Sequence, residues 1–506
     1  MNFAFLKRWL ILFLSLAVIV AARLWNYDQI VVDGQIYFID ADCYSRMTRV
    51  AEIVAHPGTI LRHHDFENWP IGTTPHTTAP LDYLIASLAW ITGNIDLAGA
   101  WISIGLAVLS GVVLWWWVRR FRWITQIAVL LLFAVSPILV HGTVFGRPDH
   151  QSLLIFLVIA AFVTEWELQK NPSQLQSILN GIAWGFALWT SLFEPAILLV
   201  ASVTLGIATQ RKQWFNRQRA TAAISLSLAS LFALSIEHWH IGPLPTGAIF
   251  ERWAKSIGEL QPVGWFTKTY LGWFGLVVIA LPFVFAWEIV KKKNGVAVYW
   301  GGLFLLTFVL CTTAARWGYF LGIAVLFSIP FLLETWRAPW IAALFFLGFW
   351  PIAAEWDSRL WPTGEERDRL AEQREDYREL RQLCQSIDGG GVIAPWWLSP
   401  SIAYWSHGKC VAGSSHQSLP GNADVAQFFL SRLPSKSREI VQRRNVRWVV
   451  AYEPSRVLST SSALLEIPAA NDAFAVTLYD QPRRVPSWLQ LERETQFFRL
   501  YRVADE

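Results

Sequence analysis

The sequence predicts a polytopic α-helical membrane protein that carries a C-terminal mixed α/β domain outside the cytoplasm. The 506 residues are 54% hydrophobic and 16% charged, with a mean hydropathy of +0.35, which is too apolar for an ordinary soluble protein. Apolar runs of roughly 16 to 20 residues recur along the chain, close to the length that a bilayer core requires. From residue 358 onward the composition becomes that of a soluble domain.

The composition also excludes several classes of protein. The 30 Trp and 32 Phe residues fit interfacial belts and lipid-facing helices. The net charge of +4 is small and gives no indication of a nucleic-acid partner. The 4 Cys form no CxxC pair and no Cys/His cluster at zinc spacing, which argues against a structural zinc site.

The first apolar run extends from Trp9 to Ala22 behind Lys7 and Arg8. It is interpreted as an uncleaved membrane anchor, with a secretory signal cleaved after Ala21-Ala22 as the alternative. Either interpretation places the following loop, residues 26–95, outside the cytoplasm. Amphipathic segments near 44–55 and 79–93 predict that this loop is folded.

Ten further apolar runs follow, so the sequence predicts eleven spans within a range of about 11–13 transmembrane helices. The two runs on either side of Phe193-Glu194-Pro195 are short for a span. The ten runs lie near residues 99–118, 123–141, 152–167, 178–193, 195–210, 220–237, 269–289, 298–313, 317–334 and 338–354.

The loops between these runs alternate in charge. Clustered Lys and Arg are retained on the cytoplasmic side, so the basic loops are predicted to be cytoplasmic. These loops contain Arg119 to Arg122, Arg211 to Arg219, Lys291 to Lys293 and Arg337. The loops 26–95, 141–151 and 237–268, together with everything after Trp356, are predicted to lie outside.

The predicted domain boundary falls between a membrane domain at 1–357 and an extracytoplasmic domain at 358–506. The second domain begins with a charged helix at 365–383 and contains short strands at 392–394, 447–452 and 497–503. Cys384 and Cys410 could form a disulfide there, with two buried thiols as the alternative.

Three acidic motifs lie in the predicted outer loops. Asp40-Ala41-Asp42 precedes an amphipathic segment, so it is either a helix N-cap or a catalytic or metal-binding pair. Asp149, in Gly146-Arg147-Pro148-Asp149-His150-Gln151, allows the same two interpretations. Glu259, in Ser256-Ile257-Gly258-Glu259-Leu260-Gln261-Pro262, is either solvated or part of the same site.

Two further motifs carry basic and aromatic groups. Arg316 starts a span, where its side chain either snorkels to the headgroups or binds an anion. Trp396 and Trp397 follow Pro395 in the outer domain, where a tryptophan pair forms either core or a binding site.

In this order and on one predicted side of the membrane, the five motifs resemble those of the oligosaccharyltransferase catalytic subunits, which are GT-C membrane glycosyltransferases. Asp40 to Arg46 resembles the first aspartate motif, and Asp149-His150-Gln151 resembles the second. Ser256 to Pro262 resembles the late Ser/Thr-x-x-Glu motif, and Arg316 resembles the arginine that follows it. Trp396 to Pro400 resembles the family's Trp-Trp-Asp-Tyr-Gly motif, and the resemblance covers nearly the whole chain.

Two positions depart from the family pattern. Gln151 stands where the second motif has its second acid, which removes one negative charge and leaves an amide oxygen as acceptor. Leu398-Ser399-Pro400 replaces Asp-Tyr-Gly, although the family uses that aspartate to hold the Ser or Thr of an Asn-x-Ser/Thr acceptor. The chain is therefore predicted not to read the Ser/Thr of such a sequon.

The resemblance implies transfer of a glycan from a polyprenyl-pyrophosphate carrier to a protein or other acceptor at the outer face. It implies a Mg²⁺ or Mn²⁺ ion held by Asp40, Asp149 and Glu259. Asp42, His150 and Gln151 are further ligand candidates, with a structural role as the alternative for His150. Arg316 would bind the pyrophosphate, and Trp396, Trp397 and Ser399 would contact the acceptor.

Three other functions remain open from the sequence. A GT-C enzyme that uses a polyprenyl-monophosphate sugar to modify a lipid or polysaccharide would share the acidic outer loop. A transporter of lipid-linked glycans would be polytopic as well. A non-catalytic scaffold is the third alternative, because Gln151 removes an acid from the second motif.

Overall fold

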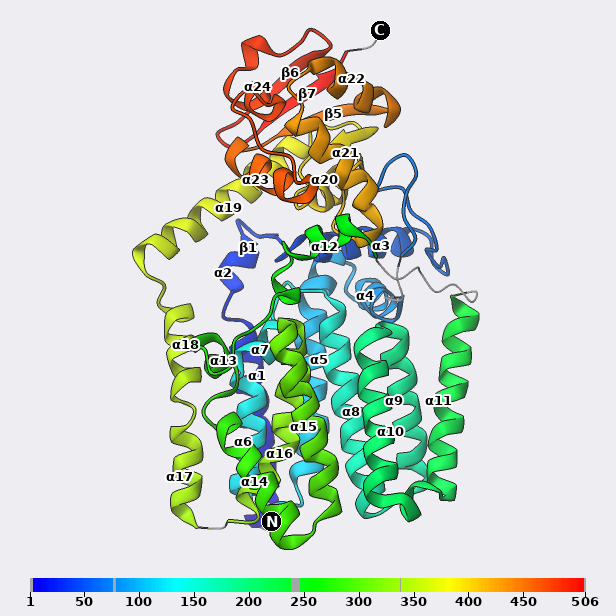
Figure 1. The fold of residues 1–506 in the computed structure, drawn as a ribbon, viewed down its shortest axis with the longest axis vertical. Helices are drawn as coiled ribbons and strands as arrows, with labels where there is room; N and C mark the ends of the chain where they lie inside the picture. Colours follow the sequence, from blue (N-terminus) through cyan, green and yellow to red (C-terminus); the bar gives the residue numbers. More distant parts are fainter. Residues whose placement is uncertain (1–2, 76–78, 238–245, 337, 505–506) are drawn as a thin grey trace.

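The structure is a computed structural model that describes residues 3–75, 79–237, 246–336 and 338–504. It consists of a bundle of long helices with a smaller α/β domain at one end (Figure 1). Each part has its own hydrophobic core, one with buried side chains between Ile11 and Ile352 and one between Leu380 and Tyr501. Arg337 and residues 238–245 of the predicted third outer loop lie outside the described residues.

Every apolar run predicted as a span is helical, which confirms the polytopic helical architecture. The helices of the bundle are α1 (Phe3–Arg23), α5 (Ile95–Val118), α6 (Trp123–Val135), α7 (Pro137–His141), α8 (His150–Lys170), α9 (Gln174–Thr190), α10 (Phe193–Trp214), α11 (Arg217–Ile236), α13 (Lys268–Phe274), α14 (Val277–Lys292), α15 (Gly295–Thr313), α16 (Gly318–Leu333), α17 (Pro339–Leu347) and α18 (Trp350–Leu360).

In the described residues, 8 helices are long and apolar enough to cross a membrane, or 9 if the pair α13 and α14, bent by 67°, forms one span. The number is lower than eleven because α9 has 17 residues and α6 has only 13. Helix α6 ends before Pro137, which starts α7 and cannot donate a backbone hydrogen bond.

A buried arginine compensates for this break. Arg23 is 0% exposed and donates to the carbonyl oxygens of Phe133 at 3.1 Å and Ala134 at 2.9 Å, in the last turn of α6. Its Nε also donates to Thr143. The side chain therefore satisfies carbonyls that a broken helix would leave unpaired in an apolar interior.

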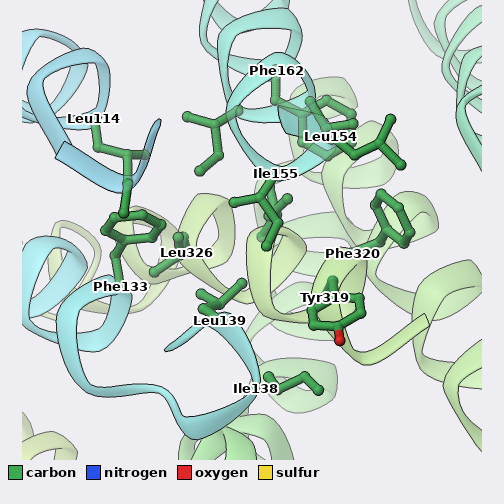
Figure 2. Packing of buried hydrophobic residues seen from close by; sticks show 14 of the residues in the cluster. Leu114, Phe133, Ile138, Leu139, Leu154, Ile155, Phe162, Tyr319, Phe320 and Leu326 are labelled. Atoms are coloured by element: carbon green, nitrogen blue, oxygen red, sulfur yellow. The ribbon is translucent and has the colours of Figure 1, made fainter. Parts of the chain in front are cut away.

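The centre of the bundle is a continuous apolar core. Figure 2 shows Leu139 of α7 and Ile155 of α8 packed with Tyr319 and Leu326 of α16, close to Phe133 of α6. All of these side chains are buried. The core thus fixes the starts of α8 and α16, the two helices that follow Asp149 and Arg316.

The two ends of the bundle differ in charge. The end far from the α/β domain holds the basic loops, where Arg219 pairs with Glu165 and Arg120 pairs with Glu167. At the same end, Lys292 lies 2.8 Å from Glu288. The acidic motifs lie at the other end, beneath the α/β domain.

The first loop is folded, as predicted, and lies between the bundle and the α/β domain (Figure 1). Its elements are α2 (Tyr27–Ile30), β1 (Val31–Val32), β2 (Gln35–Ile36), α3 (Ala41–Ala55) and α4 (Ala79–Thr92). Buried Glu67 accepts hydrogen bonds from Ser45 of α3 and from Ser415 and Ser418 of the α/β domain. This carboxylate therefore ties the domain to the helix that follows Asp40.

The C-terminal domain follows the charged helix α19 (Gly364–Cys384) and contains a five-stranded sheet in the order β4-β3-β5-β7-β6. Strands β4 and β5 both pair with β3 in parallel, and β7 pairs antiparallel with β5 and β6. The strands are β3 (Gly391–Ile393), β4 (Lys409–Cys410), β5 (Val446–Ala451), β6 (Leu489–Glu494) and β7 (Arg499–Val503). The helices are α20 (Ser399–Ser406), α21 (Leu419–Leu430), α22 (Pro434–Arg443), α23 (Pro454–Leu465) and α24 (Phe474–Asp480).

The first loop also extends this sheet. The amide of Cys410 in β4 donates to the carbonyl of Phe66, and the amide of Trp69 donates to the carbonyl of Cys410, each at 3.1 Å. The predicted Cys384–Cys410 disulfide is wrong, because both residues are buried free thiols. The alternative interpretation, two buried thiols in the domain core, is the observed one.

Candidate active site

Asp40 begins the site as the N-cap of α3. Its Oδ1 accepts the amide hydrogen bond of Cys43 at 3.0 Å, so the capping interpretation of this residue is right. The other oxygen, Oδ2, lies 3.7 Å from Nη2 of Arg147. Because the two oxygens have separate roles, capping does not prevent Asp40 from acting in a site.

Asp42 lies in the first turn of α3 with an exposed side chain. Its pKa is raised to about 7 by the desolvating effect of the surrounding protein and then by the charges of Asp40, Asp149 and Glu259. A hydrogen bond with Ser414 of the α/β domain opposes this increase. Four carboxylates from three separate parts of the chain therefore lie within electrostatic range of one another.

Asp149 is the N-cap of α8 and is almost fully buried. Its Oδ1 accepts from the amide of His150 at 2.7 Å and lies 2.6 Å from Nδ1 of that residue. Burial alone would raise its pKa, but His150 and Arg147 together hold the pKa of Asp149 well below its usual value. The carboxylate is therefore ionised at neutral pH.

Arg147 is a site residue that the sequence analysis did not identify. Its buried Nη2 lies 3.7 Å from Asp40 and 3.6 Å from Asp149, and its Nη1 lies 2.6 Å from Nε2 of His141. The guanidinium thus holds the first and second acidic motifs together. In the sequence, the only indication of this role is that Arg147 lies two residues before Asp149 in the same predicted outer turn.

Glu259 lies in the 3₁₀ helix η1 (Gly258–Leu260), in a loop that is held from both sides. On one side, the carbonyl of Gln261 accepts from the amide of Ala315 in η2 (Ala315–Trp317) at 2.8 Å. On the other side, the ring of Trp253 in α12 (Ala248–Ala254) lies 6.3 Å from that of Trp396 in the α/β domain. The loop therefore connects Arg316 with the tryptophan pair.

Arg316 lies in η2, and its charge interacts with those of Glu259 and Asp149. Its Nε lies 2.7 Å from Oε1 of Glu194, a buried residue of α10. In the sequence, Phe193-Glu194-Pro195 indicates only a break between two short spans. An acidic residue within an apolar region indicates that a basic side chain pairs with it in the folded protein.

The tryptophan motif precedes α20. Trp396 and Trp397 are half-buried, and the guanidinium of Arg456 lies 4.9 Å from the centre of the Trp397 ring. Ser399 is 0% exposed, and its hydroxyl donates to the carbonyls of Ala394 and Pro395. The structure therefore gives no support for Ser399 as an acceptor contact.

A small cavity of about 10 Å³ lies beside this pair, roughly the space of one water molecule. Its polar lining comes from Asn422, Thr460 and Ser461, and no carboxylate is among the lining residues. Leu398 does not line it.

The donor types at the acidic centre suit a hard divalent cation, because carboxylate oxygens are the ligands that Mg²⁺ and Mn²⁺ prefer. The pKa of Asp42 is raised first by desolvation and then by the charges of the neighbouring carboxylates, which a bound cation would offset. In the described part of the chain, however, no group of three or more His, Cys, Asp or Glu side chains is placed to hold a metal ion. The amide nitrogen of Gln151 is buried there without a hydrogen-bond partner.

Sequence comparison with known proteins finds related chains, although no family model matches the sequence. Dolichyl-phosphooligosaccharide-protein glycotransferase 2 of Archaeoglobus fulgidus is 21% identical over 533 residues, covering 88% of this chain and 87% of the relative. Glycotransferase 1 of the same organism is 28% identical over 180 residues, 34% of this chain and only 30% of the relative.

Solved structures give the same result for the fold. The apo oligosaccharyltransferase of Archaeoglobus fulgidus has a TM-score of 0.70 at 15% identity, over 93% of this chain and 72% of that chain. Oligosaccharyltransferase AglB from that organism, in complex with an inhibitory peptide and a dolichol-phosphate, has a TM-score of 0.65 at 14% identity, with coverages of 93% and 72%. The Archaeoglobus fulgidus oligosaccharyltransferase in complex with Zn and sulfate has a TM-score of 0.68 at 14% identity, over 93% of this chain and 71% of that chain.

The helical bundle, the folded first loop and the C-terminal α/β domain together give this chain the fold of the GT-C membrane glycosyltransferases. Within that class, the full-length relative and the similar structures confirm the resemblance of the sequence motifs. The chain is thus similar over most of its length to glycosyltransferases of the oligosaccharyltransferase kind, which indicates that it is a glycosyltransferase.

Proposed function

We propose that this protein transfers a glycan from a polyprenyl-pyrophosphate carrier to an acceptor at the outer face of the membrane. The observation that carries the proposal is that the charges of Asp40, Asp149 and Glu259 all act on Asp42, with Arg316 in electrostatic range of Asp149 and Glu259, at the end of the bundle that the α/β domain covers. This reaction needs acidic groups that act on the acceptor and a positively charged group that binds the leaving group.

The carboxylates have the chemistry to activate a weak nucleophile. An acceptor amide has a nitrogen lone pair that is delocalised into its carbonyl. Asp40 and Glu259 would accept its two N–H bonds, which weakens that delocalisation and orients the nitrogen toward the sugar. Arg147 supports this role because it holds Asp40 in place through the oxygen that α3 does not use.

A divalent cation, Mg²⁺ or Mn²⁺, is part of the proposal, with Asp40, Asp149 and Glu259 as the residues that would hold it. Asp42, His150 and the amide oxygen of Gln151 are further candidate donors. When bound, such an ion neutralises the departing pyrophosphate. An archaeal oligosaccharyltransferase of similar fold was solved in complex with Zn and sulfate, which supports a role for a divalent cation.

Arg316 would bind the pyrophosphate itself. A guanidinium presents several N–H donors in one plane and suits phosphate oxygens. Arg316 lies between the acidic centre and the apolar bundle, as the headgroup of a lipid carrier must.

An apolar groove beside this arginine supports a lipid-linked donor. A cavity of about 560 Å³ is lined by Ala196, Val200 and Leu205 of α10 and by Gly302 and Leu306 of α15. Ala196 is two residues beyond Glu194, so the groove starts next to the partner of Arg316. A polyprenyl chain could lie there in contact with apolar side chains and lipid, and AglB was solved with dolichol-phosphate.

The orientation follows from charge. The basic loops at the far end of the bundle are proposed to be cytoplasmic, and the acidic centre with the C-terminal domain is proposed to lie outside.

Transfer of radiolabel from lipid-linked glycan tests the proposal. Membranes that hold the wild-type chain would be supplied with labelled lipid-linked glycan extracted from the source cells, with and without EDTA. We expect label in an acceptor fraction, its loss in EDTA and its recovery with Mg²⁺ or Mn²⁺. Label transferred only from a polyprenyl-monophosphate sugar would overturn the proposed donor, and full activity in EDTA would overturn the metal.

A further inference from the structure

Glu194 is a buried acid that the reaction as described above does not use. It is 1% exposed and lies in the first turn of α10, where the helix dipole favours a negative charge. Ser191 donates to its Oε2 at 2.7 Å, and Nε of Arg316 lies 2.7 Å from its Oε1. Both oxygens therefore have a defined partner.

The contact with Glu194 occupies only one part of the Arg316 guanidinium. In the described part of the chain, Arg316 takes part in no other ion pair or hydrogen bond. Its terminal nitrogens, Nη1 and Nη2, are thus uncommitted, and the side chain is 20% exposed. A guanidinium held at Nε keeps its two parallel terminal donors for one external anion.

Charged and aromatic groups surround the Arg316 guanidinium. The charges of Glu259 and Asp149 act on Arg316, so the arginine lies within electrostatic range of the acidic centre. The rings of Phe193 and Trp317, the neighbours of Glu194 and Arg316 in sequence, lie 6.4 Å apart and pack the two backbones against each other. Arg316 is therefore held by a buried carboxylate at a position within electrostatic range of the acidic centre.

We propose that Glu194 is the positioning residue of donor binding, holding Arg316 so that its terminal nitrogens contact both phosphates of a lipid-linked diphosphate. This inference rests on the proposed function and adds a source of its donor specificity. A flexible arginine can attract any phosphate, whereas a guanidinium held in a fixed orientation selects an anion of matching shape. Glu194 thus sets the preference for a diphosphate over a monophosphate carrier.

Binding of undecaprenyl pyrophosphate and of undecaprenyl monophosphate to the full chain in nanodiscs tests this without an acceptor or a glycan. Arg316→Ala should weaken pyrophosphate binding by about a hundredfold. Glu194→Ala should weaken it by about tenfold and should remove most of the preference over monophosphate. Glu194→Gln, which keeps the shape of the side chain but removes the charge of the ion pair, should weaken it about as much as Glu194→Ala.

Glu165→Ala is the matched control. Glu165 also forms a buried pair with an arginine, Arg219, but at the opposite end of the bundle. Its loss should lower thermal stability about as much as that of Glu194, with both lipid affinities unchanged. This separates a general loss of folding from a loss of positioning.

The outcomes distinguish the two levels of the proposal. Wild-type selectivity in Glu194→Ala, with weak binding in Arg316→Ala, would overturn the role of Glu194 and leave the function intact. Wild-type affinity and selectivity in Glu194→Gln would overturn positioning by this ion pair, because its charge would then be dispensable. A wild-type chain that binds monophosphate as tightly as pyrophosphate would overturn the proposed donor and this inference together.

Discussion

The two ends of the helical bundle hold their charges in different ways. At the end with the basic loops, Glu165 pairs with Arg219, Glu167 with Arg120 and Glu288 with Lys292, one acid for one base. At the end beneath the α/β domain, Asp40, Asp42, Asp149 and Glu259 interact with one another, and Arg147 lies between only two of them. Matched pairs satisfy buried charge, whereas a surplus of one sign is costly and marks a functional site.

The two ends of the bundle are expected to lie on opposite sides of a membrane. Asn216→Cys, next to the basic residues that precede α11, should be labelled by a membrane-impermeant maleimide only after the cells are opened. The four native cysteines are buried, so their background labelling should be low. Asp388→Cys in the α/β domain is the matched position and should be labelled in intact cells.

Equal labelling of both positions in intact cells would contradict the assigned orientation. Labelling of Asn216→Cys alone would reverse it.

Removing charge from the acidic end should have the largest effect on turnover. Asp40→Asn and Glu259→Gln should each lower glycan transfer by about 10²-fold or more, the scale of losing one electrostatic stabiliser in a reaction centre. Folding should survive, because Glu259 is not fully buried and Asn can still cap α3. Initial rates of label transfer at saturating donor would give the comparison with wild type.

A Glu259→Gln variant with wild-type transfer would remove that residue from the mechanism. Glu251→Gln, an exposed glutamate of α12 in the same loop, is its control and should transfer normally.

Arg147 tests whether the acidic end depends on its internal cation. Arg147→Lys keeps the charge but cannot contact Asp40, Asp149 and His141 at once, so transfer should fall by roughly tenfold. The pH profile of transfer would show whether the carboxylates titrate differently in the variant. An unchanged rate and profile would show that Arg147 holds the turn without contributing to the site.

The basic end should respond in stability and not in turnover. Glu165→Gln leaves Arg219 buried without its counter-charge, which costs about 3 kcal/mol when one partner of a buried pair is removed. The melting temperature of the purified protein should fall, and the transfer rate at a permissive temperature should not change. A loss of rate at full stability would mean that the two ends are coupled.

The sequence predicts much of this fold because long apolar runs determine where helices form. It predicts less well where helices break, since the end of α6 depends on Pro137 together with Arg23, a side chain from another helix. In the α/β domain, the three predicted strands are present, but β4 and β6 were missed. Strand β4 has two residues and pairs with the first loop as well as with β3, so its local pattern is too short to identify it.

The site residues were predictable to different degrees. The acidic motifs were found through their order and their resemblance to a family, not through their local patterns, since Asp40 and Asp149 also cap helices. The pairings of Arg147 with Asp40 and of Glu194 with Arg316 were not predictable, because each joins segments distant in sequence that meet only in the folded bundle. Ser399 shows that a motif position can be buried within its own turn, so its predicted contact with the acceptor stays a prediction.

The smallest expected effect concerns acceptor selectivity, at the contact between Glu259's loop and the tryptophan pair. A site that holds a substrate hydroxyl with a buried carboxylate discriminates strongly against analogues without that hydroxyl. Here the equivalent position is Leu398, and no carboxylate lines the cavity of about 10 Å³ beside Trp396 and Trp397. Such a cavity holds about one water molecule and not a threonine side chain. Peptides with Asn-x-Thr and Asn-x-Ala should therefore be transferred at rates within about threefold of each other, or not at all if the acceptor is another molecule. Parallel transfer assays with the lipid-linked donor measure this ratio, and a hundredfold preference for the Thr peptide would contradict the prediction and indicate a hydroxyl contact elsewhere.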